Sequence, residues 1–147
     1  MKLRQLTDIA QLVRWRCEVI EAVFGTLPTD SVIEANRDYY MHHIPDGTHY
    51  AVVAEDDGVD VGCGSVCFYD ELPSPDNPRG RCAYMMSIYV KSEYRSRGAG
   101  HVIMEHLVET SRSRGCGKIY LETTESGKSL YRSLGFVGMP DMLKLIE

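Results

Sequence analysis

The sequence has 147 residues, and 16 Lys plus Arg against 21 Asp plus Glu give a formal net charge of -5. Its length suits one domain over residues 1–147, and its 44% hydrophobic and 25% charged residues disfavour disorder, collagen and coiled coil. The acidic excess disfavours nucleic acid as a partner, because a general nucleic-acid binder needs a basic face for the phosphates.

The N-terminal third predicts one strand and two helices. Residues 1–6 alternate weakly between apolar and polar side chains, which predicts a first strand. Apolar residues over 9–23 then recur every three or four positions and predict an amphipathic helix that Gly25 ends. A second helix is expected over residues 32–43, because capping residues precede it and Pro and Gly follow it.

The middle of the chain changes to a β pattern. Residues 49–55 and 59–69 are rich in strand-forming side chains and are separated by the turn 56–58, which predicts a hairpin. Residues 72–80 contain three prolines and predict a loop. A third long strand is expected over residues 81–90.

The last third alternates again between helix and strand. We expect a helix over residues 98–114, a strand over 118–123, a short helix over 126–134 and a final strand over 142–146. Hairpin and crossover connections both occur in this order. The fold class predicted is therefore α/β with a mixed sheet.

The segment after the third long strand is suited to an anionic ligand. Without side chains at Gly98 and Gly100, a ligand can approach the backbone closely. The helix that follows presents unpaired N–H groups and the positive end of its dipole, which together bind phosphate. Lys91, Arg95 and Arg97 add positive charge. The alternative is a strand-to-helix turn whose glycines only allow tight packing.

Other phosphate-binding motifs are absent from the sequence. No Gly-x-Gly-x-x-Gly occurs at Gly98, because position 103 is Ile. A P-loop ending at Gly127 and Lys128 would need Gly at position 122, which is Glu.

Two motifs resemble one known family. Residues 88–100, IYVKSEYRSRGAG, resemble the acyl-CoA signature of the GNAT superfamily of N-acetyltransferases, whose core here is Arg95 to Gly100. Residues 130–136, LYRSLGF, resemble the family's Leu-Tyr-x-x-x-Gly-Phe segment at the family's spacing. The resemblance implies a GNAT-like mixed central sheet flanked by about four helices, with a splayed strand and a phosphate-binding loop and helix.

The resemblance also implies where acetyl-CoA binds. The backbone of residues 88–90 is expected to pair with the pantetheine arm, and the N–H groups of residues 97–101 are expected to hold the pyrophosphate. Arg95 and Arg97 would help to neutralise it, although Arg97 could equally point to solvent. The full set of expected cofactor-binding residues is Ile88, Tyr89, Val90, Arg95, Ser96, Arg97, Gly98, Ala99, Gly100 and His101.

The activity implied is direct acetyl transfer to an amine in a ternary complex. Tyr131 matches the family tyrosine that protonates the departing sulfur, and a phenol with a pKa near 10 can donate that proton. The alternative is that Tyr131 only packs behind Leu134 and Phe136. Glu122 is the best carboxylate by position for the general base, and the alternative is a solvated or ion-paired Glu122.

The acceptor is expected to be a small-molecule or peptide amine. In this family its site involves the first two helices, the hairpin and the loop before the central strand. Carboxylates in those segments could attract a cationic amine, or could simply be solvated. They are Glu18, Glu21, Asp30, Glu34, Asp38, Asp70, Glu71 and Asp76.

Two rival functions remain open. One is a CoA-binding sensor or interaction module of the same fold without turnover, and the other is a phosphate-binding regulator unrelated to CoA. Members of the family often form dimers, so a homodimer is also implied.

The remaining patterns bear on location, metals and thiol chemistry. No window contains the roughly 18 apolar residues of a membrane span, and charges interrupt the N-terminal apolar positions where a signal peptide needs an unbroken centre. We expect no membrane partner. Five loosely spaced cysteines without a secretory signal favour free thiols and a cytoplasmic location. No Cys-x-x-Cys pair occurs, and His101 and His106 are poorly spaced for ligands, so we predict no metal and no cysteine nucleophile.

Overall fold

The computed structural model describes residues 1–146, over which it contains five strands and four α-helices. In chain order they are β1 (Lys2–Gln5), α1 (Ile9–Phe24), α2 (Asp30–His43), β2 (His49–Asp56), β3 (Val59–Asp70), β4 (Arg81–Val90), α3 (Ala99–Ser113), β5 (Lys118–Leu121) and α4 (Lys128–Ser133). Two 3-10 turns, Ser92–Tyr94 and Glu125–Gly127, precede α3 and α4.

The strands form one mixed sheet in the order β1-β2-β3-β4-β5. The pairs from β1 to β4 are antiparallel, and β5 runs parallel to β4. A parallel pair needs a crossover, and here α3 supplies it between β4 and β5. The predicted α/β class with a mixed central sheet and four flanking helices is confirmed.

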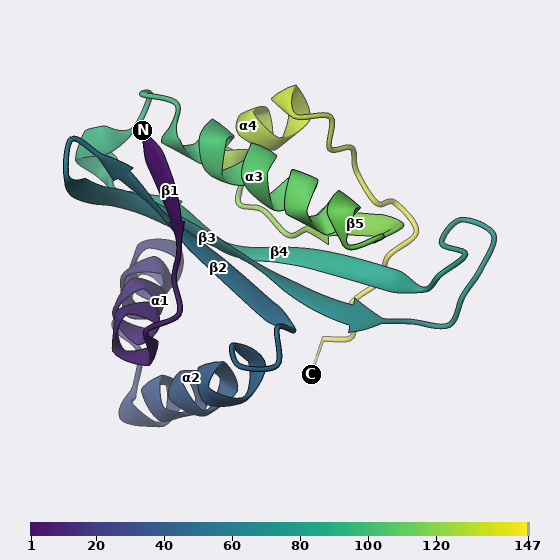
Figure 1. The fold of residues 1–147 in the computed structure, drawn as a ribbon, viewed down its shortest axis with the longest axis horizontal. Coiled ribbons are helices and arrows are strands. Elements are labelled where there is room, and N and C mark those ends of the chain that lie inside the picture. Colours follow the sequence, from purple (N-terminus) through teal and green to yellow (C-terminus); the bar gives the residue numbers. More distant parts are fainter. Residues whose placement is uncertain (147) are drawn as a thin grey trace.

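Helices cover both faces of the sheet. Figure 1 shows α1 and α2 on one face and α3 and α4 on the other. Under α3, side chains that alternate along the strands, such as Val52, Val66 and Met85, pack against Ile103 and Leu107. The other face holds a smaller cluster of Leu6, Leu12, Val13, Tyr40 and Ala51.

Local signals explain where α1 begins and ends. The Asp8 carboxylate accepts a hydrogen bond from the Gln11 N–H at 2.9 Å, which satisfies one of the donors that a helix leaves free at its start. Gly25 follows the last turn with φ 73°, a left-handed conformation that glycine adopts readily. The predicted helix therefore has the expected ends.

The predicted final strand over residues 142–146 is wrong. These residues have no strand pairing, and Leu143, Leu145 and Ile146 are 99%, 84% and 89% exposed. The pattern has the composition of a strand, but a strand also needs a neighbour for its backbone groups. The preceding β5 ends at Leu121, two residues earlier than predicted, and offers an edge of only 4 residues. In Figure 1 the C-terminal segment instead runs from α4 past β5.

None of the helices within residues 1–146 has both the length and the apolar character that crossing a membrane requires.

Candidate functional site

The central feature of the site is a gap between β4 and β5. The two strands pair only as far as Met85 opposite Leu121, while β4 continues to Val90 along its other neighbour, β3. The edge of residues 86–90 that faces β5 therefore has no strand partner among residues 1–146. Its backbone N–H and C=O groups can pair with an extended ligand. The predicted pantetheine segment, residues 88–90, lies on this edge.

A β-bulge interrupts β4 at the same place. Cys63 faces Tyr89 and Ser65 faces Met86, so Gly64 alone lies opposite two residues, Ser87 and Ile88. Ser87 has φ 59°, a left-handed conformation that is strained for a serine. The bulge changes the direction of β4 just before the open edge.

Side chains of β3 hold the bulge in place. The Cys63 thiol donates to the Ser87 carbonyl at 3.4 Å, and the Ser65 hydroxyl donates to the Met86 carbonyl at 2.8 Å. These contacts satisfy carbonyls that the interrupted ladder would leave unpaired.

The start of α3 provides a second set of free donors. Ser96 and Gly98 have φ 64° and 88°, and the first helical hydrogen bond joins the Val102 N–H to the Gly98 carbonyl at 3.0 Å. The earlier N–H groups, on Ala99, Gly100 and His101, precede the first intrahelical bond. No side chain within residues 1–146 caps this helix. The turn therefore leaves these N–H donors and the positive end of the helix dipole available to an anion.

The predicted glycines have different roles. A Cβ built on Gly98 would meet nothing within 4 Å, so the backbone there is open to a ligand. A Cβ on Gly100 would lie 3.1 Å from Leu130 Cδ2 of α4. Tight packing, the alternative interpretation, therefore accounts for Gly100, whereas Gly98 combines open space with a φ of 88° that favours glycine.

The predicted basic side chains are spread around the turn. Arg95 Nε donates to the Val90 carbonyl at 3.1 Å, and the exposed Arg97 guanidinium lies 5.5 Å from the Tyr94 ring centre. Lys91 lies over the Trp15 ring at 5.3 Å, on the α1 side of the sheet. Arg95 and Arg97 stay near the turn, and Lys91 does not contribute to it.

Two further residues of the predicted set face solvent. Ser96 is exposed, and the exposed His101 ring lies 2.9 Å from the Glu105 carboxylate one turn along α3. The backbone N–H of His101, rather than its ring, is therefore the group left available at the start of α3.

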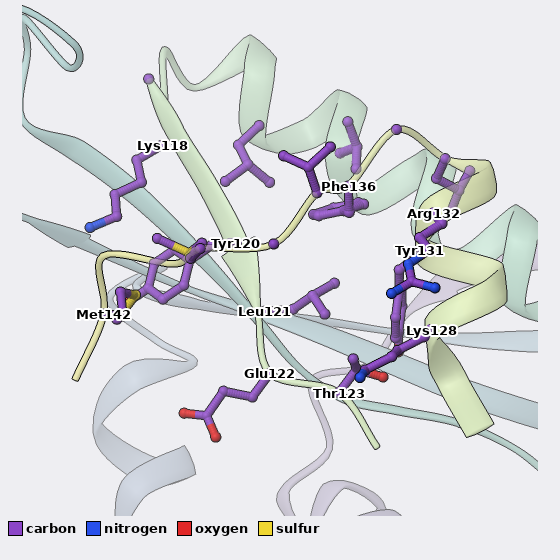
Figure 2. A pocket seen from close by; sticks show the side chains of 18 of the residues that line it. Lys118, Tyr120, Leu121, Glu122, Thr123, Lys128, Tyr131, Arg132, Phe136 and Met142 are labelled. Carbon is purple, nitrogen blue, oxygen red and sulfur yellow. The ribbon is translucent and has the colours of Figure 1, made fainter. Parts of the chain in front are cut away.

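Tyr131 packs against a neighbouring ring and also keeps a free hydroxyl. Its ring packs edge-on against Phe136, with ring centres 6.1 Å apart, and the side chain is half-buried. Its hydroxyl has no hydrogen-bond partner within the described residues. Burial raises the pKa of this phenol, so it stays protonated at neutral pH and remains a proton donor. Figure 2 shows Tyr131 beside Lys128 and Thr123.

Glu122 lies on the other side of β5. Figure 2 shows its carboxylate directed away from Tyr131. The residue is exposed and forms no ion pair in the part of the chain that the structure describes, so it is solvated. Burial and the nearby Glu122 carboxylate raise the pKa of Tyr84 to about 12. Glu122 and Tyr84 therefore share the sheet face that α1 and α2 cover.

Most of the predicted acidic acceptor residues are solvated. Those exposed are Glu21, Asp30, Glu34, Asp38, Asp70 and Asp76, of which Glu34 pairs with Arg37. Glu71 pairs with Lys118 at 3.2 Å. Glu18 is partly buried, and its charge acts on Tyr89 and Cys63, so it is the member of the set nearest the bulge.

One basic residue on this face was missed from the sequence. Arg16 Nη1 donates to the Ser87 hydroxyl at 3.3 Å, which brings a guanidinium to the bulge. The signal was present, because Arg16 follows the buried Val13 by three positions and precedes the buried Ile20 by four. A charged residue therefore lies on the inward face of an amphipathic helix.

Burial disfavours the reactive thiolate form of three of the five cysteines. All five cysteines are free, and burial raises the pKa of Cys63, Cys82 and Cys116, which suppresses their thiolates. Within residues 1–146, His, Cys, Asp and Glu form no group of three that could hold a metal ion.

A cavity of about 780 Å³ lies along the outer edge of β5, between that strand, α4 and the C-terminal segment (Figure 2). It lies at the edge on which the predicted final strand would have paired. Tyr131 and Glu122 both line it, but the bulge and the start of α3 do not. The free backbone groups of the gap between β4 and β5 are therefore distinct from this cavity.

Comparison with known proteins agrees with this geometry. A sequence profile described as "Acetyltransferase (GNAT) family" matches residues 9–136. The thialysine N-epsilon-acetyltransferase of Bos taurus is 37% identical over 60 residues, which cover 39% of this chain and 35% of that protein. The glucosamine 6-phosphate N-acetyltransferase of Trypanosoma brucei brucei is 36% identical over 53 residues, 36% of each chain. The matched segments thus span about a third of the length of these relatives.

Solved structures match over nearly the whole chain. A predicted acetyltransferase from Clostridium acetobutylicum, crystallised with acetyl-CoA, matches with TM-score 0.90 and 22% identity, covering 99% of this chain and 95% of that one. A GCN5-related N-acetyltransferase from Ralstonia eutropha JMP134 matches with TM-score 0.81 and 26% identity, covering 99% and 97%. The first match establishes similarity of fold.

Proposed function

Because the chain belongs to the GNAT acetyltransferase family, we propose that it is an acetyl-CoA-dependent N-acetyltransferase that acts directly on an amine in a ternary complex. The observation that carries the proposal is the combination of an open β4 edge with uncapped N–H groups at the start of α3. An extended amide-containing arm that ends in a pyrophosphate is complementary to both features.

The residues present fit this cosubstrate. The backbone of residues 88–90 would pair with the pantetheine arm, and the N–H groups of residues 97–101 would hold the pyrophosphate, with Arg95 and Arg97 nearby. When bound, acetyl-CoA supplies an activated acetyl thioester. A backbone N–H of the open edge, on Tyr89 or a neighbour, would polarise the thioester carbonyl.

Tyr131 and Glu122 suit opposite roles because they lie on opposite sides of β5 (Figure 2). The Tyr131 hydroxyl, on the α4 side, would donate a proton to the departing sulfur. Glu122, on the side that α1 and α2 cover, would accept the amine proton, directly or through water.

The acceptor proposed is a small-molecule or peptide amine. The relatives are named for thialysine, glucosamine 6-phosphate and an alanine of ribosomal protein bS18, which supports amine acetylation without selecting one acceptor. We also propose a cytoplasmic location, which suits the five free thiols. Formation of a homodimer is a further proposal, which light scattering would check.

The Tyr131→Phe variant tests the mechanism. Removing one general acid should lower kcat by about 10²-fold or more, while acetyl-CoA binding persists. Thiol release from acetyl-CoA with a panel of amines is the assay. Tyr50→Phe is the control, because the Tyr50 hydroxyl bonds His106, which is away from the gap between β4 and β5. Full turnover by Tyr131→Phe would contradict the assignment of the acid.

A second candidate, a CoA-binding module without turnover, is favoured by one observation. Glu122 is exposed, and burial raises the pKa of both Tyr84 and Tyr131, so neither phenol is tuned as a base near neutral pH. CoA binding without amine-dependent thiol release across the panel would support this alternative.

A further inference from the structure

Arg16 is a partly buried cation without a counter-charge. It projects from α1 toward the sheet, and its Nη1 donates to the Ser87 hydroxyl at 3.3 Å. No carboxylate within residues 1–146 lies within 4 Å of its guanidinium. Withdrawing a cation from water without a partner is unfavourable, so this position favours an anion.

The surroundings of Arg16 mix hydroxyl, aromatic and apolar side chains. A cavity of only about 10 Å³ beside it is lined by Arg16, Trp15, Tyr40, Ser65 and Ser87, and also by several aliphatic residues. Burial raises the pKa of Tyr40 to about 12, and the Arg16 charge opposes that shift, as it does at Tyr84. Both phenols therefore remain neutral and leave the positive charge of Arg16 uncompensated.

The position of Arg16 ties it to the acceptor rather than to the cofactor. It lies on the face covered by α1 and α2, whereas the start of α3 lies on the opposite face (Figure 1). Ser87, its hydrogen-bond partner, immediately precedes the open edge of residues 88–90. A group that binds Arg16 would therefore lie next to the point of acetyl transfer.

We propose that Arg16 is the anion-binding residue of the acceptor site and that the acceptor is an amine that also carries a carboxylate or phosphate. This inference rests on the proposed function and names its substrate class. The guanidinium offers paired N–H donors in the geometry that these anions accept. It also repels an acceptor whose charges are all positive, such as a polyamine.

Carboxylates are placed to receive the amine end of such an acceptor. The charges of Glu18 and Arg16 both act on the Cys63 thiol. Those of Glu122 and Arg16 both act on the Tyr84 phenol, so the two carboxylates share this region with Arg16 without pairing with it. An acceptor with both charges would direct its anion to Arg16 and its ammonium toward these carboxylates.

Matched acceptor pairs test the proposal. One pair is an amino acid and its amide, and the other is an amino sugar with and without phosphate, so the two arms separate carboxylate from phosphate recognition. We expect the wild-type kcat/KM to be at least about tenfold higher for the anionic member of one pair. Arg16→Met should lower that kcat/KM about 10- to 100-fold, mainly through KM, and remove the preference. Arg14→Met, which removes an exposed arginine of the same helix, should change neither.

A binding measurement separates this inference from the proposed function. Each amine is titrated calorimetrically into protein saturated with CoA, and thermal unfolding shows that the variants are folded. Anion-dependent binding that Arg16→Met abolishes would support the inference even without turnover. Three results would overturn it. The first is acetyl transfer or binding without a preference for the anionic amine, the second is a preference that survives in Arg16→Met, and the third is no binding of any of these amines.

Discussion

Replacing Gly64 with Ala tests the packing that holds the site together. Gly64 faces the bulge of β4, and its position is not one of the left-handed glycines, so alanine can adopt the same backbone. A Cβ there would lie 3.0 Å from Ile88 Cδ1 and 3.2 Å from Leu107 Cδ1, and closer still to Ile103 Cγ2. Ordinary carbon contacts need about 3.5–4.0 Å.

The cost follows from where those atoms lie. Ile103 and Leu107 are fully buried, so they cannot move aside into solvent, and α3 would have to shift away from β3. Overpacking of this kind costs typically about 1–3 kcal/mol. For a domain of this size, a loss of about 2 kcal/mol lowers Tm by roughly 4–8 °C. Because α3 also carries the free N–H groups at its start, affinity for acetyl-CoA should fall as well.

Urea and thermal unfolding of Gly64→Ala provide the assay, with acetyl-CoA titration as the functional readout. Gly138→Ala is the matched control, because a Cβ there would meet nothing within 4 Å. It should be neutral or more stable by at most about 1 kcal/mol. If Gly64→Ala unfolded within 0.5 kcal/mol of the wild type, using the ±0.5 kcal/mol range typical of ordinary surface changes, the packing argument would be refuted.

Three further outcomes are expected. Burial lowers the pKa of His49, which is 4% exposed, from 6.5 to about 4, so only the unfolded chain gains its proton between those values and stability falls as pH falls. The free energy of unfolding, measured in urea, should fall by about 2 kcal/mol between pH 7 and pH 5. His49→Phe should reduce this loss, and His42→Phe, which replaces an exposed histidine, should not. Gly98→Ala places alanine at φ 88°, so it should lower the free energy of unfolding by about 1–3 kcal/mol. It should also weaken acetyl-CoA binding more than Gly138→Ala does. Equal affinities of the two variants for acetyl-CoA would exclude a role of the Gly98 turn in binding. Leu143→Ser should change stability by less than about 0.5 kcal/mol, because that side chain is 99% exposed, and a larger loss would mean that the C-terminal segment packs in solution.

The local signals of the chain were sufficient for most elements and for the turn that precedes α3. The ends of α1 depend on Asp8 and Gly25, which act within a few residues of their own positions. Likewise, Gly98 and the start of α3 form a continuous segment, so a short motif carries the geometry of the turn. Such features are readable from sequence because their hydrogen bonds and backbone conformations are local.

The remaining features depend on partners that are distant in the chain. The bulge at Ser87 arises from how β3 pairs with β4, and nothing next to Ser87 in the sequence encodes that register shift. Residues 142–146 have the composition of a strand, but their backbone has no partner in the sheet and they remain exposed.

The sequence by itself therefore determined the α/β class, the helix ends and the glycine turn that precedes α3, because each depends on periodicity or on neighbouring residues. Only the tertiary structure decided that Tyr131 and Glu122 lie on opposite sides of β5 and that Arg16 reaches Ser87 across 71 positions. The physical reason is that strand register and helix packing select which side chains meet, and those contacts join segments that no local pattern connects.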